Sequence, residues 1–517
     1  MERRGRQFIR NALAVSVSAI LMRCVSVSFN VYLTDKLGAD GIGLYTLVMS
    51  VYSFAVTVAT SGINLAATRL VAEALGDGSG DPARTGQAVR AAMRAALGYS
   101  AAFGCAAAVL LFALAPTISA HWLEDTRTLP SLRLLALGLP PLALSSALGG
   151  YFAGVRRVHK SAAVQLCEQG TRVTVIICAL QVFLPRGLEY ACIGVVLGGM
   201  LAEFFSFLLL LIAFLRDRRR HFPARGERLP AGPIRRKLCG IALPVAVSAY
   251  ARSLLVTVEH LLIPICLRKN GATRDASLAA YGTLQSMVLP ILLFPSALLG
   301  SVSGLLIPEM AEYRARGDRE QIGRVASRVM RLALIFSIGA AGVMSCNAYS
   351  LGTVIYDSTD AADYIRLIAP LVPVMYLDNT VDAMLKGLGE QVYSMRVNII
   401  DASLSVALVA LLLPRFGIAG YVIVLYICEA FNAVCSLYRL LGITDIAVDV
   451  RGWVARPLIA IVGATVITRL VGMRYPAGDA LSLAMRLAVT AGVYLALVWG
   501  MEQLHRVPRR AKASCAR

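Results

Sequence analysis

Charged residues are scarce in this chain: they make up 16% of its 517 residues, against roughly 25% in an ordinary soluble protein. Hydrophobic residues make up 57%, and the mean hydropathy is +0.67. A disordered chain needs a far more polar composition, and collagen and coiled coils need a regular repeat. The shortage of charge therefore excludes most soluble folds and indicates a membrane protein.

Cysteine and histidine are also sparse, with 11 and 5 residues. The cysteines are scattered, without a CxxC pair or a Cys/His cluster at metal-ligand spacing, so we expect no disulfide scaffold and no metal. The connecting loops carry no GxxxxGK[ST], HExxH or paired-Asp signature. We therefore expect no cofactor and no enzyme activity. A membrane glycosyltransferase or polymerase, which needs a catalytic or nucleotide site, is disfavoured.

Apolar runs of about 20 residues, each long enough to cross a ~30 Å hydrocarbon layer as a helix, fill most of the chain. Runs such as Leu208 to Leu215 are apolar on every face, unlike the alternating strands of a membrane barrel. The sequence predicts an all-α polytopic membrane protein with about 14 transmembrane helices. They are expected near residues 8–33, 43–66, 91–114, 129–153, 164–184, 191–215, 238–267, 278–306, 329–350, 365–387, 396–413, 420–441, 454–472 and 482–504.

The formal net charge of +20 is explained by membrane topology. With the N-terminus inside, the cytoplasmic segments hold 36 of the 51 Lys and Arg residues and the outer loops hold 12. The segment from Arg216 to Lys237 holds nine, whereas the outer loop expected from Leu351 to Tyr364 holds none. This bias predicts that both termini lie in the cytoplasm. It also removes the reason to expect a nucleic-acid partner.

An internal repeat relates the two halves of the chain. The stretch from Arg69 to Arg94 is echoed from Ile307 to Arg331, each with an Ala-Glu pair, a Gly-Asp pair and a basic entry into the next span. Six predicted spans separate the copies, so both halves keep one orientation, as in transporters built from two parallel bundles. We expect pseudo-symmetric six-helix bundles at 1–215 and 238–441, a basic cytoplasmic linker at 216–237, and two extra helices with a basic tail at 442–517.

Two runs of sequence carry a family resemblance. They extend from Leu33 to Gly76, with the motif GADGIGLY, and from Tyr376 to Val406, with the motif KGLGEQVYSMRVN. Both resemble the stage V sporulation protein B type of oligosaccharide flippase, in the multidrug/oligosaccharidyl-lipid/polysaccharide exporter superfamily. The resemblance covers nearly the whole chain. It implies an alternating-access protein of the bacterial cytoplasmic membrane that moves undecaprenyl-diphosphate-linked sugars outward for the cell envelope or the spore cortex.

Arg23 is the leading candidate for substrate binding. It lies near the middle of the first span, where an ionised residue costs about 2.5 to 3.5 kcal/mol and usually faces a cavity or a partner. A guanidinium holds two phosphate oxygens at once, which suits a diphosphate. The resemblance also implies a cavity-facing arginine on this helix, as in lipid II flippases. The family pattern departs at Ser26 and Asn30, so only Arg23 is carried over. A snorkelling or structurally paired arginine is the alternative.

Other intramembrane charges form two groups. Glu168 with Arg172, and Asp382 with Lys386, are spaced i, i+4 and are expected to neutralise each other. Arg252 and Glu259 lie on one face of the seventh span but too far apart to touch, so each needs another partner. Arg252 is a second candidate for binding substrate. The candidates for binding a coupling ion are Glu259, beside His260, together with Asp378 and Asp401.

The sequence thus predicts a transporter whose partners are lipid-linked oligosaccharide and membrane lipids. It carries no signature of an oligomeric state and is compatible with a monomer. No nucleotide-binding motif is visible, so a membrane potential or an ion gradient is the expected energy source. A cation-coupled multidrug exporter of the same superfamily is the alternative, although a drug site is expected to be acidic and to lack Arg23. A purely structural scaffold leaves the intramembrane charges unexplained.

Overall fold

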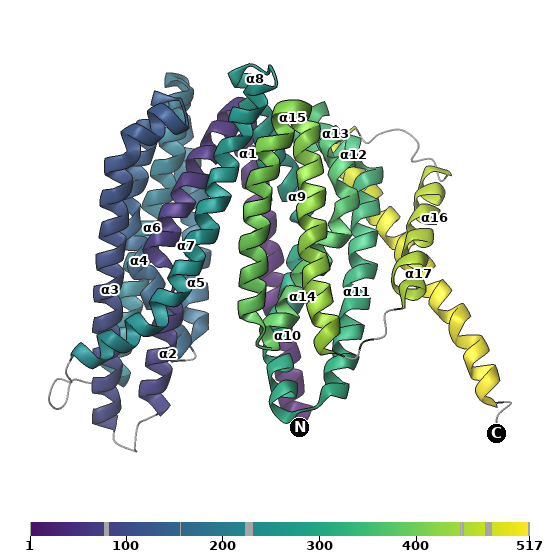
Figure 1. The fold of residues 1–517 in the computed structure, drawn as a ribbon, viewed down its shortest axis with the longest axis horizontal. Coiled ribbons are helices and arrows are strands. Elements are labelled where there is room, and N and C mark those ends of the chain that lie inside the picture. The colour runs from purple at the N-terminus through teal and green to yellow at the C-terminus, as the bar shows by residue number, and fades with distance from the viewer. Residues whose placement is uncertain are drawn as a thin grey trace. The chain divides into compact units, whose positions relative to one another are not determined.

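The computed structural model describes residues 2–76, 82–155, 157–222, 231–444, 446, 449–470 and 478–514. The described residues are overwhelmingly helical and contain no strand, which confirms the all-α class (Figure 1). Packing divides the chain into two compact units: unit 1 comprises residues 1–43 and 266–517, and unit 2 comprises residues 44–265. Each unit is described by itself.

Unit 2 is built from the second limb of α1 and from six further helices. With short turns of helix between them, these elements are α1 (Glu2–Thr60), α2 (Ile63–Gly76), α3 (Pro82–Thr117), η1 (Ile118–Trp122), η2 (Thr126–Thr128), α4 (Leu129–Gly154), α5 (Val158–Phe183), η3 (Leu184–Arg186), α6 (Leu188–His221) and α7 (Ala231–Lys269). Small residues of α2, α3, α4 and α7 form one core, and Tyr151, Phe152 and Phe214 form an aromatic core between α4 and α6.

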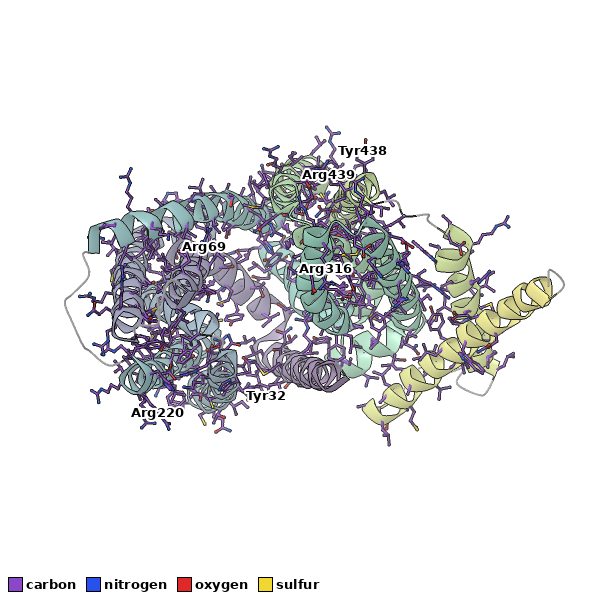
Figure 2. All side chains as sticks on the ribbon, turned by 90° about the horizontal axis from the view of Figure 1, so that it is seen from below. Tyr32, Arg69, Arg220, Arg316, Tyr438 and Arg439 are labelled. Carbon is purple, nitrogen blue, oxygen red and sulfur yellow. The ribbon has the colours of Figure 1, made fainter. Side chains whose placement is uncertain are left out.

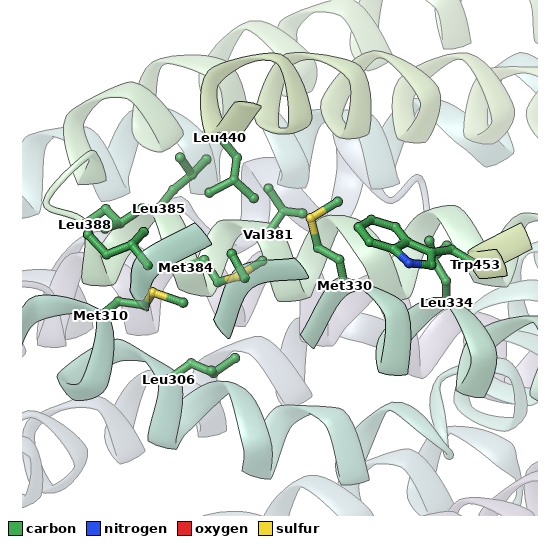
Figure 3. Packing of buried hydrophobic residues seen from close by; sticks show 12 residues of the cluster. Leu306, Met310, Met330, Leu334, Val381, Met384, Leu385, Leu388, Leu440 and Trp453 are labelled. Carbon is green, nitrogen blue, oxygen red and sulfur yellow. The ribbon is translucent and has the colours of Figure 1, made fainter. Parts of the chain in front are cut away.

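Unit 1 holds the first limb of α1 and the remaining elements. These are α8 (Arg274–Gly282), η4 (Thr283–Val288), α9 (Leu289–Leu293), α10 (Ser296–Arg316), α11 (Arg319–Cys346), α12 (Ala348–Tyr356), α13 (Thr359–Ile368), η5 (Ala369–Leu371), α14 (Val372–Gly387), α15 (Gln391–Ile443), η6 (Arg451–Ala455), α16 (Arg456–Leu470) and α17 (Ala480–Ser514). A core of Leu and Met side chains with Trp453 joins α10, α11, α14 and the end of α15 (Figure 3).

Eleven helices among the described residues are long and apolar enough to cross a membrane. The expected count of 14 is therefore not confirmed as it stands. Two of the eleven are pairs of helices merged across a kink, at Gly38 in α1 and at Gly417 in α15. The span expected at 365–387 is divided among α13, η5 and α14, whose pieces are individually short. Long apolar runs thus specify helices, but the number of spans counted depends on where a helix is kinked or interrupted.

The GADGIGLY motif forms the kink of α1. Gly38 has φ 73° and ψ 172°, a backbone conformation that strongly favours glycine. Five residues later, a Cβ on Gly43 would lie 2.1 Å from the carbonyl oxygen of Leu278 in α8, so a side chain does not fit there. The motif therefore redirects the chain and lets two helices pack closely.

Two segments expected as loops are largely helical. Arg216 to His221 is the last part of α6, where four basic residues in the final turn stabilise the negative end of the helix dipole. The expected outer loop from Leu351 to Tyr364 consists of α12 and α13, which meet at Asp357 with φ 50°. The Ser358 hydroxyl accepts a hydrogen bond from the Ala361 backbone at 3.2 Å and caps α13. Of the linker, residues 223–230 lie outside the described part.

The compact units also differ from the expected order of bundles. Residues 1–43 pack with unit 1, and residues 231–265 of α7 pack with unit 2. In α7, Leu238 and Ala242 are buried against α2 and α3, so packing follows apolar faces and not position along the chain. The C-terminal pair is part of unit 1, because Tyr494 of α17 and Ile461 of α16 pack against Ile338 of α11. The pseudo-symmetry of two bundles stays a prediction.

Many large apolar side chains are exposed, including Val109 (69%), Val434 (66%) and Leu470 (79%). Soluble monomers seldom expose apolar surface on this scale, whereas a bilayer covers it. Tyr438 and its neighbour Arg439 lie at the outer surface of α15 (Figure 2). Aromatic and basic side chains are common where a membrane helix meets the headgroups. The exposed surface therefore agrees with a multi-pass membrane protein.

Candidate functional site

Arg23 lies in the first limb of α1 and is half-buried. Its Nε is buried and has no hydrogen-bond partner, and Arg23 forms no ion pair within the described part of the chain. A buried donor of a charged group that is left unsatisfied costs about 1–3 kcal/mol or more. The fold therefore holds a guanidinium that an anionic ligand would stabilise.

An aromatic pair lies next to this cation. The charge of Arg23 is close enough to act on the hydroxyl of Tyr376 in α14. Tyr376 is fully buried, and its hydroxyl donates a hydrogen bond to the carbonyl of Leu292. Its ring stacks on Phe336 of α11, with the centroids 6.3 Å apart. The buried ring of Tyr376, held by its hydrogen bond and by its stacking on Phe336, therefore forms a fixed environment for Arg23.

An apolar groove of about 760 Å³ begins beside Arg23. Val27 lines it and lies one helical turn after Arg23, so both residues share a face of α1. Phe336 of α11 contributes to the wall, and the other lining residues come mainly from α9, α11, α12 and α17. The further lining residues include Ile291, Phe294, Leu332, Gly339, Val343, Leu351, Ile355, Leu487, Ala491 and Leu495. Unit 1 therefore places a lone cation at the edge of a long apolar surface.

Three carboxylates gather elsewhere in unit 1. Asp378 of α14 accepts a hydrogen bond from Ser436, while its Oδ1 is buried without a partner. Glu429, in the second limb of α15, lies within electrostatic reach of both Asp378 and Asp401. No group of three His, Cys, Asp or Glu side chains has metal-ligand geometry among the residues that the structure describes. Glu429 thus lies at the centre of a group of three intramembrane carboxylates.

The two pairs expected to neutralise each other do make contact. Lys386 Nζ lies 2.5 Å from Asp382, and Arg172 lies 2.7 Å from Glu168. Arg172 also lies 3.7 Å from Glu203 of α6. Sequence reasoning missed Glu203, although a single carboxylate within the apolar run LAEFFSF was a signal for it.

Tyr52 adds a fourth member to this group in unit 2. Its hydroxyl donates a hydrogen bond of 2.9 Å to Glu203. Glu203 is largely buried, with 13% of its side chain exposed. Two carboxylates therefore share one guanidinium, Glu203 also binds a phenol, and the pair expected at Glu168 and Arg172 is part of a larger network.

Arg252 and Glu259 both lie on α7 in unit 2. Arg252 is exposed and has no ion pair among the described residues, so its cation is available. Glu259 and His260 are half-buried, and both take part in interactions. The structure thus assigns Arg23, Asp378 and Asp401 to unit 1 and Arg252 and Glu259 to unit 2.

Comparison with known proteins decides the family. The polysaccharide biosynthesis protein family matches residues 8–314, more than half of the chain. The chain belongs to that family. The MatE family matches residues 265–411. Two relatives come from Bacillus subtilis (strain 168): stage V sporulation protein B is 24% identical over 97% of this chain and 98% of the relative, and sporulation protein YkvU is 21% identical over 74% and 83%.

Two solved structures show the same fold. Lipid II flippase MurJ in an inward closed conformation gives a TM-score of 0.70 at 11% identity and covers 94% of this chain and 98% of its own. An inward-facing multidrug resistance MATE family transporter of the MOP superfamily gives 0.63 at 13% identity, covering 84% and 99%. These findings confirm the resemblance seen in the sequence. The chain is a multi-pass membrane protein of the polysaccharide biosynthesis family, and it has the fold of these two transporters.

Proposed function

We propose that the protein flips an undecaprenyl-diphosphate-linked sugar outward across the bacterial cytoplasmic membrane by alternating access. One observation carries the proposal: Arg23 has no partner in the described chain and lies at the edge of an apolar groove of about 760 Å³. A ligand that satisfies both features has an anionic head and a long apolar tail. A polyprenyl diphosphate has this chemistry, and the lipid II flippase and sporulation relatives support the assignment.

In this proposal each part of the ligand has its own contact. The guanidinium of Arg23 binds the diphosphate through its fork of N–H donors. The polyprenyl tail lies in the groove along α11 and α17. Arg252 on α7 supplies a second cation during part of the cycle. The polar sugar needs only an aqueous path, which explains how a single transporter fold accepts a large head group.

In this proposal the energy for transport comes from an ion gradient or the membrane potential and not from nucleotide hydrolysis. Asp378 and Asp401, with Glu259 on α7, are the proposed groups for binding a proton or a monovalent cation. Asp378 has a buried oxygen without a hydrogen-bond partner, and Glu429 places a further negative charge near both aspartates. A bound cation relieves this repulsion. We place both termini and the 216–237 segment in the cytoplasm, as the basic residues predict.

A cation-coupled multidrug exporter is the second candidate. The MatE match over residues 265–411 and the carboxylates Asp378, Asp401 and Glu429 favour it. A drug exporter binds apolar cations, so an unpaired arginine beside the groove would repel its substrate. Arg23 therefore favours the binding of an anionic lipid-linked sugar and disfavours the binding of a cationic drug.

Purified protein in proteoliposomes separates the two functions. We expect translocation of a fluorescent undecaprenyl-diphosphate sugar and no accumulation of a fluorescent lipophilic cation. Empty liposomes give the background, and a short water-soluble sugar diphosphate tests whether the tail is needed. Transport of the dye without flipping of the lipid-linked sugar would establish the exporter and reject the flippase.

A further inference from the structure

A second cavity, of about 480 Å³, lies in unit 2 between α3 and α7. We call it the α3–α7 cavity. It is separate from the apolar groove, which is formed by unit 1. Its size falls in the range of about 300–1,000 Å³ that suits small ligands. The proposed transport reaction does not use this cavity.

Two arginines line the α3–α7 cavity. Arg94 of α3 and Arg235 of α7 are both exposed, and neither forms an ion pair or hydrogen bond within the described ranges. Arg90 adds a third positive charge near Arg94, and its guanidinium is held by two hydrogen bonds of 2.7 and 3.0 Å to the carbonyl of Phe222. Like charges close together repel. An anion at this position would stabilise all three.

The deeper part of the cavity is apolar. Figure 1 shows that α3 and α7 both begin toward the same end of unit 2, and in each helix an apolar lining residue follows the arginine. Phe103 follows Arg94 by nine residues and Leu243 follows Arg235 by eight, which is roughly 12 to 14 Å of helix. Both residues line the cavity. The cavity therefore has cationic lining at one point of each helix and apolar lining roughly 12 to 14 Å farther along that helix.

Two further residues of α3 shape the apolar part. A Cβ on Gly98 would meet nothing within 4 Å, so this stretch of α3 leaves open space. The Tyr99 ring stacks on Phe103 with the centroids 4.2 Å apart and forms a flat wall. The Tyr99 hydroxyl is buried and has no hydrogen-bond partner in the described chain. The protein alone does not satisfy this donor.

We propose that the α3–α7 cavity binds one anionic phospholipid, with its phosphate between Arg94 and Arg235 and one acyl chain along Gly98 and Leu243. A free phosphate would use the arginines but not the apolar depth, and a neutral lipid would leave the cations unmatched. Basic residues near a membrane surface attract anionic headgroups. This lipid is a bound component of unit 2 and is not the transported substrate.

Native mass spectrometry tests the site on the full-length protein in detergent. The protein is equilibrated with equal amounts of phosphatidylglycerol and phosphatidylcholine of matched chains. We expect wild type to retain one phosphatidylglycerol with a preference on the order of 10-fold or more. Arg94→Gln with Arg235→Gln should reduce the preference to nearly 1.

The matched control removes two arginines from the same helices outside the cavity. Arg84 and Arg236 are exposed and do not line it, so Arg84→Gln with Arg236→Gln should keep the preference of wild type. An equal loss in this control would show a general attraction to basic surface, and an unchanged preference in the cavity variant would show binding elsewhere. Either result overturns the proposal.

The apolar part is tested with both arginines in place. Gly98→Leu fills the open space, so it should abolish retention of phosphatidylglycerol. Gly240→Leu on α7 also meets open space but does not line the cavity, and it should have no effect. Excess glycerol 3-phosphate should fail to displace the lipid. Full displacement by that soluble headgroup, or normal retention by Gly98→Leu, would show that no acyl chain is seated and would overturn the assignment to a lipid.

Discussion

Burial of the Arg23 guanidinium costs free energy in the folded protein, and a bound anionic ligand would offset this cost. Its Nε is buried without a partner in the described chain, although Asp and Glu side chains are present in the same unit. Arg172 contrasts with it, because two carboxylates lie within 3.7 Å of that guanidinium. Arg172 is thus neutralised within the protein, whereas Arg23 is not, and Arg23 marks the proposed binding site.

We predict that Arg23→Ala lowers flipping on the order of 10- to 100-fold, the equivalent of one charged hydrogen-bonding contact of about 1.5–3 kcal/mol. Arg23→Lys should recover only part of the rate, because lysine lacks the planar fork. The rate is measured in proteoliposomes at matched protein content. Arg366→Ala removes an exposed arginine of α13 as a control. Wild-type flipping by the alanine variant would show that Arg23 is merely tolerated.

Asp217 is a buried carboxylate that stabilises the contact between two helices. The sequence does not reveal this role, because Asp217 stands within a run of basic residues. Its carboxylate lies 2.6 Å from Arg157, also pairs with Lys160 and accepts a 2.8 Å hydrogen bond from Tyr151. The side chain of Asp217 is 0% exposed, whereas those of Arg157 and Lys160 are about one-third exposed. These contacts fasten the start of α5 to the end of α6.

We expect Asp217→Asn to lower the free energy of unfolding of unit 2 by about 1–3 kcal/mol, less than a fully buried pair because the cations reach solvent. The midpoint of thermal unfolding in detergent measures the change. Asp363→Asn, at an exposed position on α13, should leave the midpoint in place. If both variants melt alike, the Asp217 contacts do not contribute to stability.

At the scale of the element, α17 has a role that its position near the end of the chain does not suggest. Tyr494 is buried against α11 and donates a hydrogen bond to the carbonyl of Ile335 at 2.6 Å. Leu487, Ala491 and Leu495 of the same helix line the apolar groove. The C-terminal helix pair therefore completes a wall and is more than an appendage to the bundle.

We predict that Ala491→Phe narrows the groove and slows flipping of a full-length polyprenyl substrate more than that of a short-chain analogue. Ala496→Phe is the control, because Ala496 is exposed on α17 and does not line the groove. Flipping rates of both lipids are compared in proteoliposomes. Equal slowing of the two lipids by Ala491→Phe would place the tail outside the groove.

At the scale of the whole molecule, the first prediction concerns topology. Basic residues are three times more numerous in the segments expected inside than in those expected outside. In a background without the native cysteines, a new cysteine at Gly226 should react with a membrane-impermeant reagent only after cells are permeabilised. Gly226 lies outside the described residues. Asp360→Cys, in the expected outer segment, should react in intact cells. Labelling of the Gly226 site in intact cells would reverse the topology.

The second prediction at this scale concerns energy. An inside-negative potential favours outward movement of a diphosphate by about 2.3 kcal/mol per charge per 100 mV. We expect an imposed potential without an ion gradient to accelerate flipping in proteoliposomes, and Asp378→Asn and Asp401→Asn to retain this response. Indifference to potential together with dependence on a proton or sodium gradient would show that a bound ion, and not the membrane potential, supplies the energy.

The sequence by itself determined the helical class, the membrane setting and the family, and it singled out Arg23 as a candidate for binding substrate. These properties depend on local features: apolar runs of spanning length, motifs such as GADGIGLY, and a single cation in an apolar stretch. Helix ends were less predictable, because basic residues extended α6 into the expected linker and Ser358 started a helix in the expected outer loop. Polar residues at such positions can cap a helix as well as form a loop.

Only the tertiary structure decided which charges are satisfied. Glu203 and Tyr52 lie far from Arg172 in sequence, and Ser436 lies far from Asp378, so no spacing rule links them. The two cavities likewise arise where side chains of separate helices fail to fill space, as at Gly98 of α3 and Leu243 of α7. Helical periodicity reports which residues share one face, whereas a cavity or an ion pair depends on which face of another helix is packed against it.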